Sequence, residues 1–235
     1  MGRVSAGIAH EVRNPLAAIA QANALLLEDE LSAEQAQLAR MVADNVERLK
    51  RIVDDVMEVA PGEPQPAGVI DASSLVATIC GDWTRTAALG HALAGVLAVD
   101  LPAEPLGIVF DAEHLRRVLV NLLDNARRHA GDAPGAIRLR LSARDERRAV
   151  ISVASGTEPI APEVERYLFE PFFSTRSRGT GLGLYICREL CQRYGGSIDY
   201  RQRTERDTHR NEFVVLMRRG PLPAALPAQS RSLFA

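Results

Sequence analysis

The chain has 235 residues, of which 46% are apolar and 25% are charged, and its formal net charge is −2. This near-neutral balance gives no electrostatic reason to expect nucleic-acid binding, and the length allows one or two domains with a real core. Its three cysteines form no disulfide framework or CxxC metal motif, and no apolar run approaches the roughly 20 residues that span a bilayer, so we expect a cytoplasmic chain without membrane contact of its own.

Residues 1–60 have the pattern of two amphipathic helices. Apolar side chains recur at alternating spacings of three and four residues, which is typical of bundle seams. Ser32 and Gln35 form a capping-box pattern that predicts the start of the second helix after a short turn. Two such helices bury only one stripe each, so we expect a homodimer in which two hairpins form a four-helix bundle. Asn45, a polar residue in the seam, could set the register.

The rest of the chain mixes helical and strand periods. A linker rich in proline and glycine at 61–68 separates the hairpin from a second domain at 69–219. The predicted helices are 73–89, 113–129 and 181–194, and the predicted strands are 107–110, 136–142, 149–153 and 212–217. This content predicts an α+β fold with helices laid on a mixed sheet. Residues 220–235 have no periodicity and are predicted to form a disordered tail.

A histidine stands out in the first helix. On a helical wheel His10 falls about 200° from the seam residue Ile8, so its ring should face solvent. An exposed imidazole is a competent nucleophile, and the neighbouring Glu11 could hold its tautomer and accept its proton. Asn14 lies one turn later on the same face. Taken alone, however, a surface histidine usually has no catalytic or binding role.

A polar stripe runs along the helix predicted at 113–129. Asn121, Asn125 and Arg128 are spaced i, i+4 and i+7, so they share one face. Amide oxygens are suitable Mg²⁺ ligands, and a guanidinium can bind phosphate. The alternative for this stripe is an ordinary solvated helix face.

A glycine-rich turn precedes the helix predicted at 181–194. It reads Gly179-Thr180-Gly181-Leu182-Gly183, and its backbone amides could approach phosphate at a helix N-terminus. It matches neither the dinucleotide fingerprint nor the P-loop. Arg176 lies just upstream of this turn. The aromatic cluster of Phe169, Phe172 and Phe173 is best interpreted as hydrophobic pins that fold this segment onto the domain.

Three stretches together resemble a known family. Residues 5–16 resemble the H box of histidine kinases, residues 121–129 resemble their N box, and residues 169–184 resemble their F box, ATP lid and second glycine box. The resemblance implies a dimerisation and phosphotransfer hairpin followed by a GHKL-type α/β sandwich. It also implies autophosphorylation of a histidine with Mg-ATP, transfer to an aspartate of a response regulator receiver domain, and a phosphatase role for Asn14. The chain starts nine residues before His10, which suggests an upstream sensor region that could be membrane-bound.

The resemblance also assigns roles within the site. It implies Asn125 as the principal Mg²⁺ ligand with Asn121 as a helper, and it places Arg128 and His129 near phosphate or adenine. The remaining expected ATP contacts are in the first glycine box, the lid and the second glycine box, namely Ser155, Gly156, Arg176, Gly179, Thr180, Gly181, Leu182 and Gly183.

The first glycine box departs from the family pattern. In residues 153–160, Ala154 stands at the expected position of an adenine-binding aspartate, and Glu158 stands at a glycine position. An unpaired buried donor costs about 1–3 kcal/mol, so we expect ATP binding roughly ten- to hundredfold weaker, with Ser155 or a water compensating in part. An alternative function is therefore a kinase homologue with impaired nucleotide binding that acts as a docking and phosphatase module. A structural coiled-coil adaptor would explain only the first 60 residues.

Overall fold

The computed structural model describes residues 2–59, 67–88, 95–156, 158–175, 179–204 and 207–222, with the side chains of 2–10, 58–59 and 87–88 outside the description. In that part of the chain, no helix combines the length and apolar character needed to cross a bilayer. The predicted linker at 61–68 and the predicted tail at 220–235 fall largely outside the described residues.

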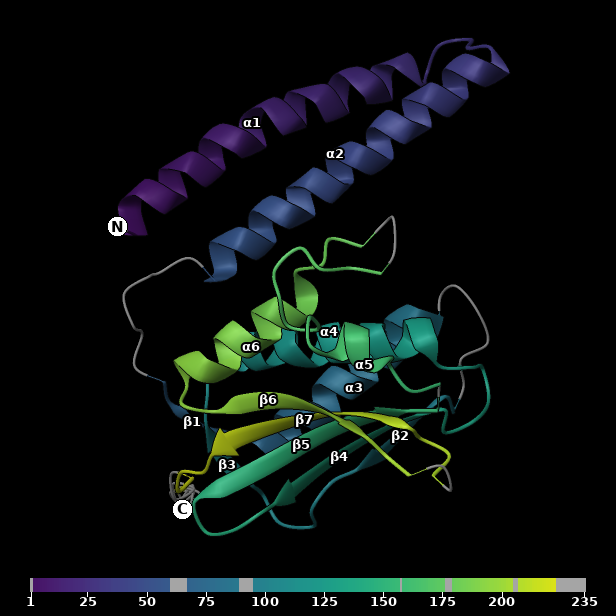
Figure 1. The fold of residues 1–235 in the computed structure, drawn as a ribbon. Coiled ribbons are helices and arrows are strands. Elements are labelled where there is room, and N and C mark those ends of the chain that lie inside the picture. The colour runs from purple at the N-terminus through teal and green to yellow at the C-terminus, as the bar shows by residue number, and fades with distance from the viewer. Residues whose placement is uncertain are drawn as a thin grey trace, which may run out of the picture.

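The two N-terminal helices form an antiparallel hairpin. α1 (Gly2–Leu26) continues through Pro15, and α2 (Ala33–Val59) follows a short turn. The predicted capping box is present, because the backbone amide of Ser32 donates to Gln35 Oε1 (2.9 Å) and the amide of Gln35 donates to Ser32 Oγ (3.2 Å). Figure 1 shows the hairpin lying across the helical side of the second domain.

Only part of the apolar surface of the hairpin is used within one chain. Leu16 and Asn23 of α1 are buried with Ala39 and Val46 of α2. The Asn23 amide donates to the backbone oxygen of Ala39 (2.9 Å), so Asn23 fixes the register of the hairpin, whereas Asn45 donates to Met41 of its own helix. Most of the predicted seam is exposed, namely Val12, Ile19, Leu26, Leu38, Val42, Leu49 and Val56.

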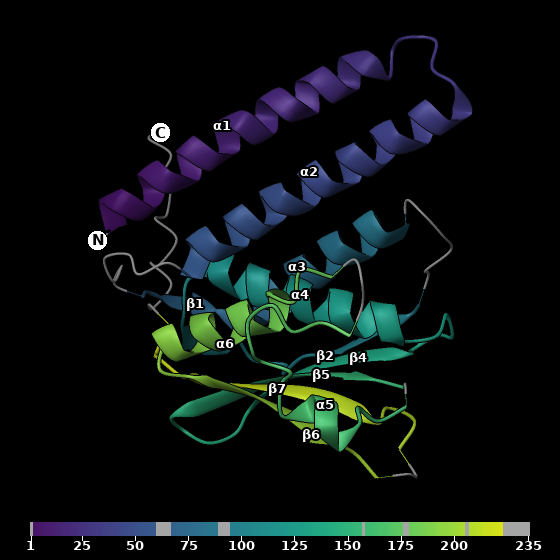
Figure 2. The same cartoon turned by 45° about the horizontal axis from the view of Figure 1, so that its top comes forward.

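The second domain is a mixed sheet whose three longer helices lie on one face (Figure 2). Its helices are α3 (Ala72–Ala88), α4 (Ala112–His129), α5 (Pro162–Glu165) and α6 (Gly183–Arg193). Its strands are β1 (Val69–Asp71), β2 (Leu97–Asp100), β3 (Gly107–Val109), β4 (Ile137–Ala143), β5 (Arg148–Ser155), β6 (Ser197–Gln202) and β7 (Asn211–Arg218). The main sheet has the order β2-β4-β5-β7-β6, with β2 parallel to β4 and the other pairs antiparallel. β1 and β3 form a separate antiparallel pair.

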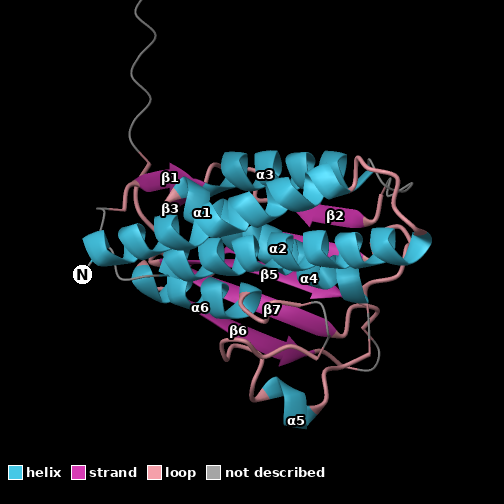
Figure 3. Ribbon diagram, turned by 90° about the horizontal axis from the view of Figure 1, so that it is seen from above, coloured by secondary structure: helices cyan, strands magenta, loops and turns pink. Residues whose placement is uncertain are grey.

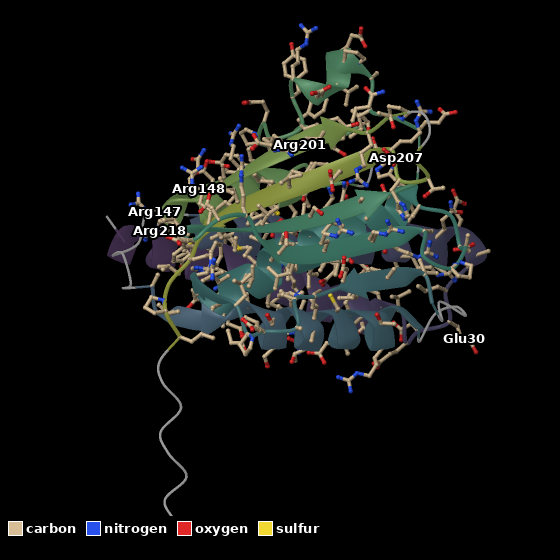
Figure 4. The ribbon with its side chains drawn as sticks, turned by 90° about the horizontal axis from the view of Figure 1, so that it is seen from below. Glu30, Arg147, Arg148, Arg201, Asp207 and Arg218 are labelled. Atoms are coloured by element: carbon tan, nitrogen blue, oxygen red, sulfur yellow. The ribbon has the colours of Figure 1, made fainter. Side chains whose placement is uncertain are left out.

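Successive side chains along each strand point to opposite faces of the sheet. Leu139, Ile151 and Val215 are fully buried and belong to the core with Leu119 and Leu122 of α4. Seen from above, α3, α4 and α6 cover this face (Figure 3). The other face carries charged side chains, and Figure 4 shows Arg148 and Arg218 close together at one end. The core thus lies between one sheet face and three helices, as predicted for an α+β sandwich.

The cysteines are core thiols. Cys187 and Cys191 are buried in α6, and Cys80 is buried in α3. Burial raises the pKa of Cys191 to about 12 and that of Cys80 to about 11, so neither forms a thiolate near neutral pH. All three thiols therefore serve the packing of the domain.

Candidate functional site

The asparagine stripe of α4 faces the start of α6. Asp111 caps α4, accepting from the amides of Glu113 (2.9 Å) and His114 (3.0 Å). The amide nitrogen of Asn121 donates to the backbone oxygen of Gly183, the first residue of α6, at 3.3 Å. Asn121 thus joins the two helices, a contact that the sequence did not predict.

Two further contacts show that α6 runs antiparallel to α4. The Cys187 thiol lies 3.7 Å from the backbone oxygen of Val118, and the Tyr194 hydroxyl contacts the ring of His114. The N-terminus of α6 therefore opens toward the last two turns of α4, where Asn125 lies. Unpaired amides and the helix dipole make such an N-terminus favourable for anions. Arg128 and His129, both exposed, lie on the same two turns.

The glycine-rich turn in front of α6 folds tightly against the preceding loop. Gly181 has a φ of +71°, and a Cβ there would lie 2.5 Å from the carbonyl carbon of Phe172. The hydroxyl of Thr180 accepts from the amide of Leu182 at 3.3 Å. Glycine is therefore required at 181 both for its backbone angle and for this close approach. Arg176 lies outside the described residues.

The three phenylalanines of this loop do not act alike. Phe169 packs edge-on against Phe213 of β7, with ring centroids 6.3 Å apart, and Phe173 packs on Tyr167. The prediction that they pin the loop holds for these two. It is wrong for Phe172, which is 64% exposed and has a φ of 63°. A positive φ is unusual for a bulky residue, and it turns the Phe172 ring away from the domain.

The end of β5 corrects the assignment of Ala154. Ser155 pairs with Ile137 of β4 and Asn211 of β7, all of which are buried on the helical side of the sheet. Ala154 is also buried, but it alternates with Ser155 and belongs to the opposite face, outside the main core. Residue 154 therefore cannot face a ligand held between α4 and α6. Ser155, followed by Gly156, lies on the helical side of the sheet.

Helix α4 is also held in place by contacts with α3. The indole nitrogen of Trp83 in α3 donates to Asp124 Oδ1 at 2.8 Å, and Arg116 of α4 pairs with Asp82 of α3 at 3.1 Å. Asp124 is adjacent to Asn125, so α3 fixes the orientation of the candidate Mg²⁺ ligand. Sequence reasoning missed this support, because nothing in the local pattern links Trp83 to Asp124.

The structure locates His10 only through its helix. His10 belongs to α1, and its side chain lies outside the description; Glu11 and Asn14 are exposed. The guanidinium of Arg13 pairs with Asp54 at 2.6 Å, a second contact between α1 and α2 beside that of Asn23 with Ala39. Counted from these two contacts, His10 lies between the levels of Ile52 and Met57 of α2.

The hairpin contacts the second domain through α2. Arg48 donates to the backbone oxygen of Gly179 at 3.2 Å, and the buried carboxylate of Asp55 pairs with Arg117 of α4. The glycine-rich turn thus lies at the level of Arg48, four to nine residues from the level of His10, or roughly 6–13 Å along the helix axis. The sequence did not predict these contacts; the only hint is an acidic residue, Asp55, beside apolar seam positions.

Comparison with family profiles gives two matches in series. The family described as "His Kinase A (phospho-acceptor) domain" matches residues 1–65. The family described as "Histidine kinase-, DNA gyrase B-, and HSP90-like ATPase" matches residues 110–220. The first covers the hairpin, and the second covers α4, the glycine-rich turn and α6.

Similar curated proteins and solved structures agree with these matches. The chain is 34% identical to the sensor protein kinase PilS of Pseudomonas aeruginosa over 209 residues, covering 87% of this chain and 39% of PilS. It is 30% identical to the sensor histidine kinase ZraS of Klebsiella oxytoca, covering 85% of this chain and 42% of ZraS. The chain thus spans about two fifths of the length of these relatives. A crystal structure of full-length ShkA in complex with AMPPNP shares the fold, with a TM-score of 0.71, 24% identity, and coverage of 94% of this chain and 47% of ShkA.

Proposed function

Because this chain belongs to the sensor histidine kinases, as their catalytic core, we propose that it phosphorylates itself on His10 with ATP and passes the phosphoryl group to an aspartate of a response regulator. The observation that carries this proposal is the meeting of the asparagine stripe with the N-terminus of α6. Asn121 contacts Gly183 directly, and Asn125 lies one turn beyond, toward the opening.

We assign the nucleotide to the space between α4, the glycine-rich turn and the end of β5. The triphosphate is expected at the amides of residues 179–183 and beside Arg128, with Arg176 near the γ-phosphate. The base is expected near Ser155, Gly156 and His129. Oxygen donors at Asn125, with Asn121 beside it, fit Mg²⁺, which would neutralise phosphate charge when bound.

The reaction itself needs mostly positioning. A ring nitrogen of His10 attacks the γ-phosphorus, the bond from phosphorus to the β,γ-bridging oxygen breaks, and ADP leaves. The proton on the other ring nitrogen goes to Glu11, the adjacent carboxylate. Since the glycine-rich turn lies roughly 6–13 Å from the level of His10 along the hairpin, the second domain either moves along the hairpin or serves His10 of a second copy.

We further propose a homodimer built on the exposed seam of the hairpin. Seven apolar seam residues remain exposed in the single chain, and Ile19 and Leu49, both 47% exposed, lie near the middle of their helices. A continuous apolar stripe of this kind is favourable only when another surface covers it. A second hairpin has the matching stripe and would complete a four-helix bundle.

The receiver domain of the regulator is expected to dock on the hairpin around His10. Small residues there, such as Ala17 and Ala18, leave its approach open, and both are exposed. Asn14, one turn from His10, is assigned to orient a water toward the regulator's aspartyl phosphate. The donor is ATP, so the proposed reaction belongs to the cytoplasm.

The test is incubation of the full chain with γ-labelled Mg-ATP. Label should enter the wild-type chain as an acid-labile, alkali-stable phosphoramidate, and it should be lost in His10→Gln and in Asn125→Ala. Full labelling of His10→Gln would overturn the proposal. If the wild-type chain binds nucleotide but neither it nor any variant is labelled, the chain would act as a docking and phosphatase module, a function that the comparisons do not support.

A further inference from the structure

Buried polar side chains gather at one end of the sheet. In the described part of the chain five polar or charged side chains are buried, and three of them are Ser155, His209 and Asn211. Ser155 ends β5, Asn211 begins β7, and the two are direct partners in the sheet. Buried polar groups are costly unless they are hydrogen-bonded, so their concentration at one place points to a specific task.

Asn211 ties the segment after β5 to the sheet. Its Oδ1 accepts from the amide of Ile160 (3.2 Å) and from the hydroxyl of Tyr200 in β6 (2.6 Å). Its Nδ2 donates to the backbone oxygen of Glu158 (2.9 Å). One side chain therefore satisfies two backbone groups of residues 158–160 and is itself oriented by Tyr200.

His209 ties a second loop to the same strand. Its Nε2 lies 2.6 Å from the backbone oxygen of Gly135, in the connection between α4 and β4. A carbonyl only accepts, so Nε2 carries the proton and Nδ1 accepts from the hydroxyl of Thr208, at 3.0 Å. The backbone of Thr208 also supports Gly156, where an added Cβ would lie 2.6 Å from the Thr208 oxygen.

We propose that Asn211 is a positioning residue for the base-binding end of the nucleotide site, and this inference rests on the proposed function. The segment after β5 contains Glu158 and Pro159 where the resemblance expects a glycine-rich backbone. The side chain of Asn211 fixes this segment beside Ser155 and Gly156, and His209 fixes the opposite loop. In the first glycine box, side chains from the start of β7 therefore hold the loop in place, a task that the glycine-rich backbone itself performs in the family pattern.

Affinity measurements with three ligands test this role. Adenosine reports the base end alone, ADP adds two phosphates, and Mg-ATP adds the metal-dependent end. Asn211→Leu, which removes the hydrogen bonds to Glu158, Ile160 and Tyr200 at similar volume, should weaken all three ligands by a similar factor, about tenfold. Asn211→Asp keeps an oxygen that accepts from Ile160 and Tyr200, loses only the hydrogen bond to Glu158, and should lose less affinity. Asn125→Ala should weaken Mg-ATP but leave adenosine unchanged.

The matched control is Asn23→Leu, which removes the other buried asparagine, in the hairpin, and should leave all three affinities unchanged. Affinities are measured at a temperature where melting curves show every variant folded. If Asn211→Leu does not fold, Tyr200→Phe carries the test, with an expected loss of about threefold. A folded Asn211 or Tyr200 variant with wild-type affinity for adenosine, or a loss confined to Mg-ATP, overturns the inference. A wild-type chain that binds no adenine compound overturns the proposed function, and this inference with it.

Discussion

The carboxylate of Asp55 in α2 pairs with the guanidinium of Arg117 in α4, so a buried charge pair joins the hairpin to the sandwich domain. Together with the contact from Arg48 to Gly179, it holds the glycine-rich turn against α2. Burial raises the pKa of Asp55 above its ordinary value, because desolvation outweighs the attraction and hydrogen bond of Arg117. The ionised pair therefore adds little net stability to the contact between the hairpin and the sandwich domain.

The first prediction concerns the pH dependence of this contact. A raised pKa in the folded state means that folding favours the protonated form of Asp55. The contribution of this carboxyl group to the free energy of unfolding is therefore complete below about pH 3.8, and it is lost as the pH rises through the raised pKa. Asp55→Asn is neutral at every pH. Its stability relative to wild type should therefore increase as pH rises above about 4 and then level off. Urea unfolding at a series of pH values measures this, and Asp44→Asn, at an exposed position of the same helix, is the control.

The second prediction concerns Gly181. Alanine there would force a non-glycine residue into a φ of +71° and place its Cβ 2.5 Å from the Phe172 carbonyl carbon. We expect Gly181→Ala to lower the free energy of unfolding by about 1–3 kcal/mol. Gly183→Ala is the matched control, because its Cβ would meet Asn121 Oδ1 at an ordinary 3.5 Å and alanine favours the helix. Equal stability of the two variants would contradict the described turn.

The third prediction concerns the support of α4 by α3. Trp83→Phe removes the donor to Asp124 and leaves a partly buried carboxylate without that bond. The free energy of unfolding should fall by about 1–2 kcal/mol in chemical denaturation. Combining it with Asp124→Leu should recover part of the loss, since neither polar partner then remains. Strict additivity of the two changes would show that the hydrogen bond contributes nothing.

The sequence predicted the parts of the fold whose signals are local. The helices of the hairpin and α3, α4 and α6 follow from apolar periodicity and caps, and each begins or ends within a few residues of its predicted bounds. The strands β1, β2 and β6 and the short α5 were missed. Each is brief, and β6 alternates charged with apolar residues at the edge of the sheet, so tertiary pairing decides it.

The candidate site also combines residues with a local sequence signal and residues that only the tertiary structure brings in. Asn121 and Asn125 lie one turn apart and the glycine-rich turn is a short local run, and the structure brings Asn121 to the start of α6. The supports of the site come from other segments: Trp83 from α3, and His209 and Asn211 from the start of β7. No local period marks such residues. Ala154 was misplaced for a related reason, because only the pairing of β5 with its neighbours shows which side chain faces the helices.

The fourth prediction concerns dimerisation. Leu49→Glu places a charge in the middle of the exposed seam, where a dimer would bury it, and should convert the chain to a monomer. Light scattering after size-exclusion chromatography measures the mass directly. Val99→Glu alters a residue of similar exposure on β2, outside the hairpin, and should leave the mass unchanged. A Leu49→Glu variant that keeps the wild-type mass would place the dimer contact elsewhere.

The fifth prediction separates the phosphatase role from the kinase role. Asn14 is exposed one turn after His10, where its amide could hold a water in line with an aspartyl phosphate on a docked regulator. Attack by that water breaks the bond between phosphorus and the carboxylate oxygen, releasing inorganic phosphate and restoring the aspartate. Asn14→Ala should leave labelling of His10 intact and slow regulator dephosphorylation at least about tenfold.

The control for this role is Gln21→Ala, which removes an exposed amide two turns further along the same helix face and should change neither rate. Both rates are measured with the same purified regulator, first phosphorylated and then freed of ATP, so that the forward transfer cannot replenish it. If Asn14→Ala and Gln21→Ala dephosphorylate the regulator equally fast, the water is positioned by another group. If Asn14→Ala instead loses labelling of His10, then Asn14 serves the attack on ATP. Autophosphorylation and regulator dephosphorylation use the same face of α1, but only autophosphorylation uses ATP as the phosphoryl donor.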